Sequence, residues 1–152
     1  MTGPTEPLHS DPVVSMVLPA DSENVAVVRH ALAGAIEALG GDREVIDDVK
    51  LAVTEACGNV VLHAYDPNDP DRRRRPLQVA LYADNGAVTI AVRDHGSGML
   101  AHAAHAKRTP GLGLGMPLMA ALARHLEARG RAGGPGTEMV MTFDLTPAAQ
   151  QA

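Results

Sequence analysis

Three polar side chains recur at four-residue intervals: Glu55, Asn59 and His63. On a helix with 3.6 residues per turn this spacing stacks them along one face. A solvated helix face usually mixes Lys, Glu and Arg, whereas this one carries a carboxylate, an amide and an imidazole beside the small residues Ala56 and Gly58. The pattern indicates a ligand-binding face, although a chance arrangement on a partly exposed polar face would have the same spacing.

A carboxylate and two glycines follow the apolar run that ends at Val92: Asp94, Gly96 and Gly98, in the sequence DHGSG. A carboxylate at the end of a strand can accept hydrogen bonds from an amino group, and glycines let a ligand approach the backbone closely. The same residues also mark ordinary turns, so this motif by itself does not decide between the two.

A second glycine cluster, GLGLG, has its glycines at Gly111, Gly113 and Gly115 and opens a predicted helix. Backbone N–H groups at a helix N-terminus form a site for anions. The cluster lacks the lysine and hydroxyl residue of a phosphate-binding Walker loop, and it lacks the spacing of a dinucleotide fingerprint. It therefore predicts an anion site of another kind.

The hydrophobic pattern predicts the elements that position these motifs. Helices are expected after Asp21 or Ser22 up to Gly40, after Asp42 up to about Ala64, and over residues 116–125, with Pro117 in the first turn of the last. Strands are expected over residues 13–18, 77–82, 87–92, 126–131 and 139–145, with Asn85 and Gly86 in a tight hairpin and a loop over residues 66–76. The proline-bearing ends, residues 1–12 and 146–152, are expected to be flexible tails around one domain at 13–145.

These elements predict an α+β fold. Five strands arranged mainly in hairpins leave few strand–helix–strand crossovers, which favours a mixed, mostly antiparallel sheet with helices on one face. The chain has 152 residues, which fits a single domain of this two-layer sandwich type.

Composition argues against a nucleic-acid partner. The formal net charge is −5, and the chain has no Trp, one Phe and two Tyr, so it has few side chains to neutralise phosphates or stack on bases. Its basic block is Arg72, Arg73, Arg74 and Arg75, which we expect to be solvated, with an acidic partner as the alternative.

The cysteine content and hydropathy predict a cytoplasmic protein without a membrane segment. Cys57 is the single cysteine, so no disulfide can form within the chain. No uninterrupted apolar stretch approaches the roughly 18 residues of a membrane span, and the first residues do not resemble a signal peptide.

The order of the motifs resembles that of the GHKL ATPase superfamily. The matching segments are EACGNVVLHAY, DHGSG, GLGLGM and the pair Gly136 and Thr137. Within the superfamily, the short form is similar to the anti-sigma factor serine kinases of bacterial partner-switching systems. The resemblance extends from about residue 13 to residue 145, and it implies the GHKL ATP-binding fold.

The resemblance implies a role for each motif residue, with ATP and Mg²⁺ as ligands. Asn59 matches the Mg²⁺ ligand, Glu55 matches the residue that activates the attacking hydroxyl, and Asp94 matches the carboxylate that accepts from the adenine amino group. The remaining nucleotide-binding residues are implied to be Gly96, Gly98, Lys107, Arg108, Gly111, Leu112, Gly113, Leu114, Gly115 and Thr137. Residues 99–110 match a lid over the nucleotide; a metal role for its histidines, His102 and His105, is not expected, because two histidines without further ligands seldom bind a metal.

The resemblance implies an ATP-dependent serine kinase that phosphorylates an anti-anti-sigma partner of the STAS type and sequesters a sigma factor, so regulating transcription. Two alternatives remain open at this point. The chain could be a non-catalytic ATP-binding module that holds its sigma factor by contact alone, or a kinase-like regulator of another protein. The resemblance also makes a homodimer possible, and the sequence does not indicate which sigma factor or STAS protein is the partner.

Overall fold

The computed structural model describes residues 11–97, 112–131 and 133–146. The helices in these ranges are α1 Ser22–Ala38, α2 Arg43–Asn59, the π-helical turn η1 Val60–Ala64, the 3₁₀ turn η2 Arg72–Arg74 and α4 Leu112–Leu122. The strands are β1 Val14–Pro19, β2 Pro76–Asp84, β3 Ala87–Asp94, β4 His125–Gly130 and β5 Thr137–Asp144. None of the described helices is both long enough and apolar enough to cross a membrane.

The strands form one five-stranded sheet in the order β1-β2-β3-β5-β4. Each pairing among the described strands is antiparallel. The β2–β3 hairpin turns at Asn85 and Gly86, whose φ angles of 49° and 78° lie in the left-handed region that an Asn-Gly hairpin requires. The α+β prediction is confirmed, and the described sheet contains no parallel pair.

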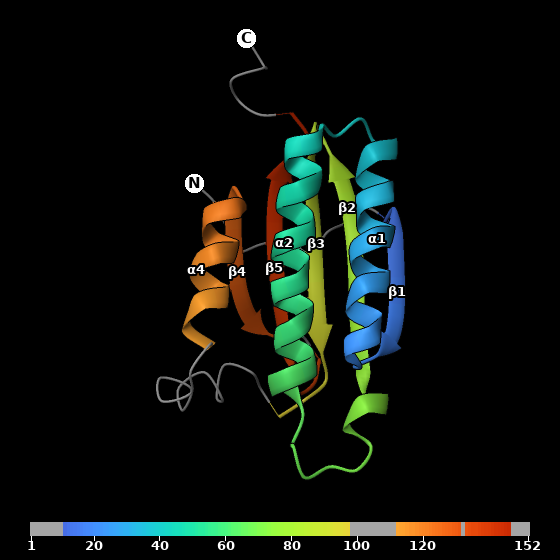
Figure 1. Cartoon of the computed structure of the whole chain (residues 1–152), viewed down its shortest axis with the longest axis vertical. Coiled ribbons are helices and arrows are strands. Elements are labelled where there is room, and N and C mark those ends of the chain that lie inside the picture. Colours follow the sequence, from blue (N-terminus) through green and yellow to red (C-terminus); the bar gives the residue numbers. More distant parts are fainter. Residues whose placement is uncertain (1–10, 98–111, 132, 147–152) are drawn as a thin grey trace.

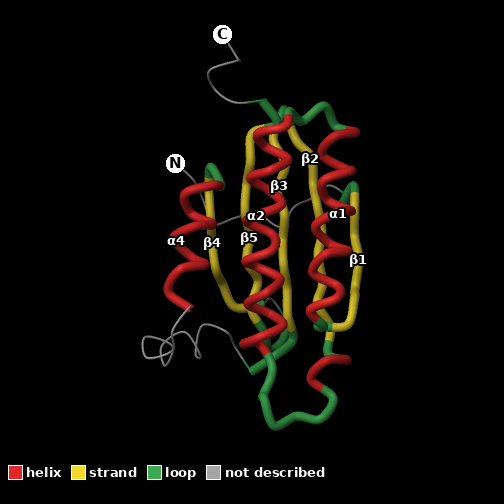
Figure 2. Tube along the Cα trace, in the orientation of Figure 1, coloured by secondary structure: helices red, strands yellow, loops and turns green. Residues whose placement is uncertain are grey.

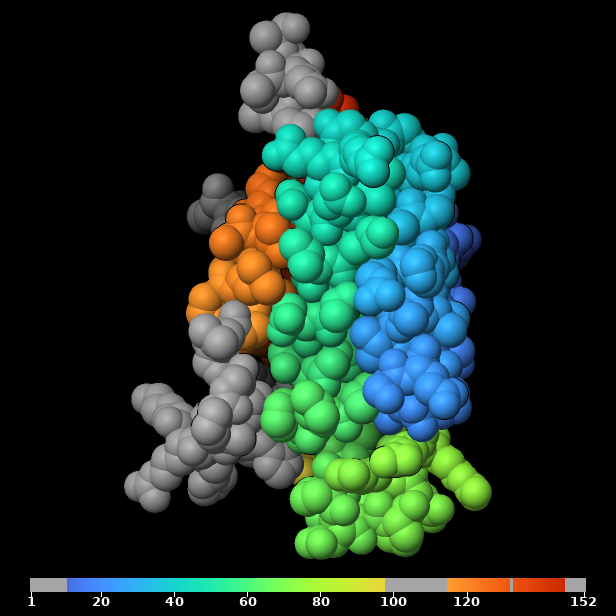
Figure 3. Space-filling model, in the orientation of Figure 1, coloured from blue at the N-terminus to red at the C-terminus, as the bar shows by residue number. Residues whose placement is uncertain are grey.

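The helices α1, α2 and α4 cover one face of this sheet, as the ribbon and tube views show (Figures 1 and 2). The space-filling view, from the same direction, shows the outer surface of the helix layer, with α2 lying between α1 and α4 (Figure 3). The core lies between the two layers: α1 contributes Val28, Leu32 and Ile36, all fully buried, as the helical period predicts. Alternate strand residues such as Leu81 and Ile90 meet them from the sheet.

Aspartates start the first two helices where the sequence predicts them. The Asp21 side chain accepts from the N–H of Glu23 at 3.1 Å, and Asp42 accepts from the N–H of Val45 at 3.0 Å. Each satisfies a backbone donor that has no partner within the helix. These two caps fix the direction in which α1 and α2 leave their loops.

The third helix begins earlier than predicted. α4 starts at Leu112 and includes Gly113 and Gly115 in its first turns, so Pro117 lies inside the helix and not in its first turn. Glycine disfavours helix, which is why the sequence pattern placed these residues before the helix; packing of α4 against α2 outweighs that preference. The predicted loop at 66–76 is also partly wrong, because it contains η2 and its last residue, Pro76, begins β2.

The face of the sheet opposite the helices carries a polar row. Glu138 on β5 is paired with Arg93 on β3 and with Arg129 on β4. Burial raises the pKa of Glu138, but the two arginines outweigh it and hold the pKa below its usual value. This row therefore ties three adjacent strands together on the face away from the helices.

Candidate functional site

Glu55 and Asn59 lie one helical turn apart at the C-terminal end of α2, and both are half-buried. His63 lies four residues further on in the π-helical turn η1, where i→i+5 bonding replaces i→i+4. Wide turns of this type are frequent at functional sites. The structure thus keeps the carboxylate and the amide as a pair and turns the chain differently after them.

The first turns of α4 face this pair. A Cβ atom built on Gly115 would lie 3.2 Å from Glu55 Oε2 and 3.4 Å from Asn59 Nδ2. Contacts this short leave little room for a side chain, so glycine lets the α4 backbone come close to the two polar groups. Residues separated by more than fifty positions along the chain are thereby brought into one site.

Asp94 is the last residue of β3 and is fully buried. Its Oδ1 accepts from the backbone N–H of Gly96 at 2.9 Å and from that of Thr137 at 3.3 Å. Its Oδ2 is buried without a hydrogen-bond partner in the described part of the chain. Burial raises the pKa of Asp94, although the two backbone donors act in the opposite direction.

A buried acceptor without a donor is costly and calls for an explanation. An N–H group of a bound ligand would supply the donor that Asp94 Oδ2 lacks.

Two glycines let the backbone close around Asp94. A Cβ on Gly96 would lie 1.8 Å from the carbonyl oxygen of Ala64, and one on Gly136 would lie 2.0 Å from the carbonyl oxygen of Asp94. Gly136 also has a φ of 125°, a backbone angle that residues other than glycine rarely adopt. Any larger residue at either position would displace the turn that carries Asp94.

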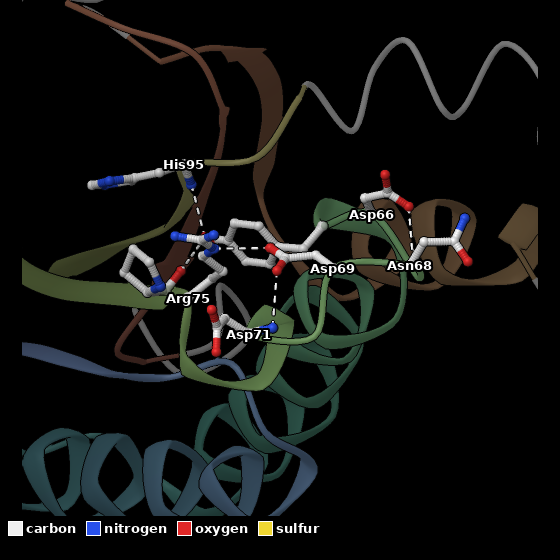
Figure 4. A network of polar contacts seen from close by, with 8 residues as sticks. Asp66, Asn68, Asp69, Asp71, Arg75 and His95 are labelled. Carbon is white, nitrogen blue, oxygen red and sulfur yellow. Dashed lines mark hydrogen bonds and ion pairs between the residues drawn. The ribbon is translucent and has the colours of Figure 1, made fainter.

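Tyr65 holds the same turn from its other side, and the sequence did not show how. Its hydroxyl accepts from the backbone N–H of His95 at 3.0 Å and donates to the carbonyl of Pro76 at 2.5 Å. In Figure 4 the dashed line from His95 marks this hydrogen bond, next to the Arg75–Asp69 ion pair of the following loop. Tyr65 is the last residue of the matching segment EACGNVVLHAY, and that position was the available signal for it; it left a packing or capping role and direct contact with a ligand equally open.

The two parts of the site lie at one end of the molecule. The end of α2, the end of β3 and the start of α4 meet there (Figure 1). The turn η1 joins the parts, since it follows Asn59 directly and its last residue, Ala64, contacts Gly96.

The structure accounts for some of the predicted site residues and not for others. It brings together Glu55, Asn59 and Gly115, and separately Asp94, Gly96 and Thr137. Leu112, Gly113 and Leu114 lie in the first turn of α4. Outside the described residues lie Gly98, Lys107, Arg108 and Gly111 and the predicted lid at 99–110 with His102 and His105. Among the residues described, no three His, Cys, Asp or Glu side chains cluster as metal ligands.

Comparison with known proteins gives a consistent result. A family model described as the histidine kinase-like ATPase domain matches residues 18–143. The serine-protein kinase RsbW of Halalkalibacterium halodurans is 40% identical over 59% of this chain and 51% of its own length, and RsbW of Bacillus pumilus is 34% identical over 52% and 49%. The chain thus spans about half the length of the curated relatives that it matches.

A solved structure shows the same architecture. The crystal structure of the RsbU and RsbW domains of Rv1364c from Mycobacterium tuberculosis matches with a TM-score of 0.64 and 26% identity, over 91% of this chain and 34% of that one.

Proposed function

The chain belongs to the histidine kinase-like ATPase domain family, and we propose that it is an ATP-dependent serine kinase of the anti-sigma type. The observation that carries ATP binding is the buried Asp94, whose Oδ1 holds two backbone donors and whose Oδ2 has no partner in the described residues. That arrangement leaves one oriented acceptor for the adenine amino group. Thr137, which donates its own N–H to Asp94, supports the same contact.

Asn59 would hold the Mg²⁺ ion through its amide oxygen. The donor set fits a hard cation that takes its other ligands from phosphates and water, because an amide and a carboxylate lie together beside Gly115. When bound, Mg²⁺ would neutralise charge that develops on the phosphates.

Glu55, one turn before Asn59, would accept the proton of the substrate serine or orient its hydroxyl. Its carboxylate stands beside the Gly115 backbone, which keeps it directed to the same space as Asn59. Positioning of this kind supplies most of the catalysis in phosphoryl transfer. Kinase activity therefore depends mainly on Glu55.

The remaining assignments follow the resemblance. Gly96 and Gly98 would lie beside the base, and residues 111–115 would cover the phosphates with backbone N–H groups at the start of α4. Lys107 or Arg108 would reach a phosphate from the lid.

The partners would be a sigma factor and an anti-anti-sigma protein of the STAS type, with a homodimer as the assembly. The relatives named serine-protein kinase RsbW support this proposal. A second candidate is a binding module that holds the sigma factor without catalysis. The presence of both Glu55 and Asn59 at the site favours the kinase, because a module of that kind does not need a proton acceptor beside its metal ligand.

Transfer of labelled γ-phosphate from ATP to a STAS-type partner tests the proposal. We expect Glu55→Gln to abolish transfer while ATP binding, measured by calorimetry with Mg²⁺, and sigma-factor binding persist. Asn59→Ala should weaken Mg²⁺–ATP binding itself. The exposed Glu37 on α1 provides a control, since Glu37→Gln makes the same change away from the site.

Two results would contradict the proposal. Failure of the unmodified chain to bind ATP would remove the whole assignment. Binding without transfer to any STAS-type partner would favour the non-catalytic module.

A further inference from the structure

We propose that Tyr65 is a positioning residue that sets Asp94 for recognition of the adenine amino group. This inference rests on the proposed function, since it assigns a role within the same ATP site. The contact that carries it is the hydroxyl bridge from His95 through Tyr65 to Pro76.

The bridge stands at the point where β2 and β3 separate. Leu77 and Asp94 are the last paired residues of the two strands, so Pro76 and His95 would form the next opposing pair. The Tyr65 hydroxyl lies between that N–H and that carbonyl, where a direct ladder bond would otherwise form. A side chain from the end of η1 therefore holds the two strand ends apart.

The position of Asp94 depends on this separation. His95 follows Asp94 directly, and the next residue, Gly96, donates its N–H to Asp94 Oδ1 and packs against the carbonyl of Ala64. Tyr65 comes directly after Ala64, so one short segment contacts the Asp94 turn through both its backbone and its hydroxyl. If the bridge were lost, the strand ends would either close or leave two polar groups unpaired, and both changes would shift Asp94.

The tyrosine is suited to this role. Only 8% of the surface of Tyr65 is exposed, so water does not readily take the place of its hydroxyl between His95 and Pro76. Burial also raises its pKa, which keeps the proton that it donates to Pro76. The chain's other tyrosine, Tyr82, is half-buried on β2, where it pairs with Thr89 away from the Asp94 end of the hairpin. Tyr82→Phe is therefore a matched control.

The test compares binding of ATP with binding of the analogue that lacks the 6-amino group, purine riboside triphosphate. We expect Tyr65→Phe to weaken ATP binding about fivefold, the net contribution of one hydrogen bond, while the analogue, which cannot use Asp94, binds as before. The affinity ratio of the two nucleotides then falls about fivefold, and in Tyr82→Phe it stays at the unmodified value. A purely structural Tyr65 would lower the melting temperature and leave this ratio unchanged, and that result would overturn the inference.

A measurement on the unmodified protein tests the same point without a variant. Exchange of the His95 amide hydrogen should slow when ATP binds and slow less with the analogue, because only ATP engages Asp94. Equal protection by the two nucleotides would refute the coupling. If the unmodified protein does not distinguish ATP from the analogue at all, the adenine role of Asp94 fails, and the present inference fails with it.

Discussion

Replacing Asp94 by asparagine should change nucleotide binding and folding stability in opposite directions. The amide oxygen of the variant can keep the bonds that Oδ1 receives from Gly96 and Thr137, which places the new NH₂ group where Oδ2 now lies. That NH₂ group would face the adenine amino group, so two donors would meet in a buried site. Loss of a charged acceptor and burial of unpaired donors cost about 3 kcal/mol, which is roughly a hundredfold in the ATP dissociation constant.

The same substitution should not destabilise the unliganded protein. Asp94 carries a buried carboxylate with one oxygen lacking a partner in the described chain, and burial raises its pKa. A carboxyl whose folded-state pKa is raised contributes stability at low pH that is lost as the pH rises through that pKa. Asp94→Asn should therefore equal or exceed the unmodified protein in free energy of unfolding near neutral pH, by up to about 1 kcal/mol, and lose this advantage in acid.

Calorimetry with Mg²⁺–ATP and urea denaturation over a pH series measure the two effects. Asp84→Asn provides a control, because Asp84 is exposed at the end of β2 and the substitution removes the same charge. Unchanged ATP affinity in Asp94→Asn would show that the carboxylate does not recognise the base. A loss of several kcal/mol in stability at neutral pH would show that Oδ2 already has a partner within the protein.

Three further outcomes are expected. Gly115→Ala should slow phosphoryl transfer about tenfold, because the added Cβ would displace Glu55 and Asn59. The same change should raise helix stability by about 0.5–1 kcal/mol. Gly34→Ala on α1 is the control: its Cβ would meet nothing within 4 Å, so it should give the gain in stability without the loss of activity. Glu138→Gln should lower the free energy of unfolding by about 2 kcal/mol near neutral pH, as measured by urea denaturation. Because the pKa of Glu138 is lowered in the folded state, the difference between variant and unmodified protein should vanish as the pH falls through that pKa. Cys57 is buried, and burial raises the pKa of its thiol to about 12. Alkylation near pH 8 should therefore proceed only through opening of the fold, and an osmolyte that stabilises the folded protein should slow it. Rapid labelling of the native protein would contradict the burial of Cys57.

Much of the fold could be predicted because local signals agree with one another. Asp21 and Asp42 are caps followed by helical periods, and Asn85 with Gly86 is a turn between two alternating runs. The start of α4 could not be predicted in this way, because the propensity of Gly113 and Gly115 argues against helix and only contact with α2 reverses it. Tertiary packing commonly overrides propensity in this manner.

The residue types in the sequence indicate which side chains belong to the site, but they do not give the three-dimensional arrangement of those side chains. The spacing of Glu55 and Asn59 predicts their shared face, but the change to π-helix after Asn59 has no signal in the sequence of Val60 and its neighbours. The partners of Asp94 could not be predicted either, because Gly96 and Thr137 are separated by 41 positions and come together through the pairing of β3 with β5.

The π-helical turn joins the part of the site proposed to bind the base to the part proposed to hold Mg²⁺. A segment of five residues separates Asn59 from Tyr65, and its wide turns decide where the tyrosine hydroxyl arrives. An α-helical path would turn each residue further about the axis and carry the hydroxyl away from Pro76 and His95. The bridge would then be lost and with it the placement of Asp94, even though every motif residue would remain in the sequence. The geometry of η1 therefore matters to the ATP site as much as the identity of the residues at its two ends.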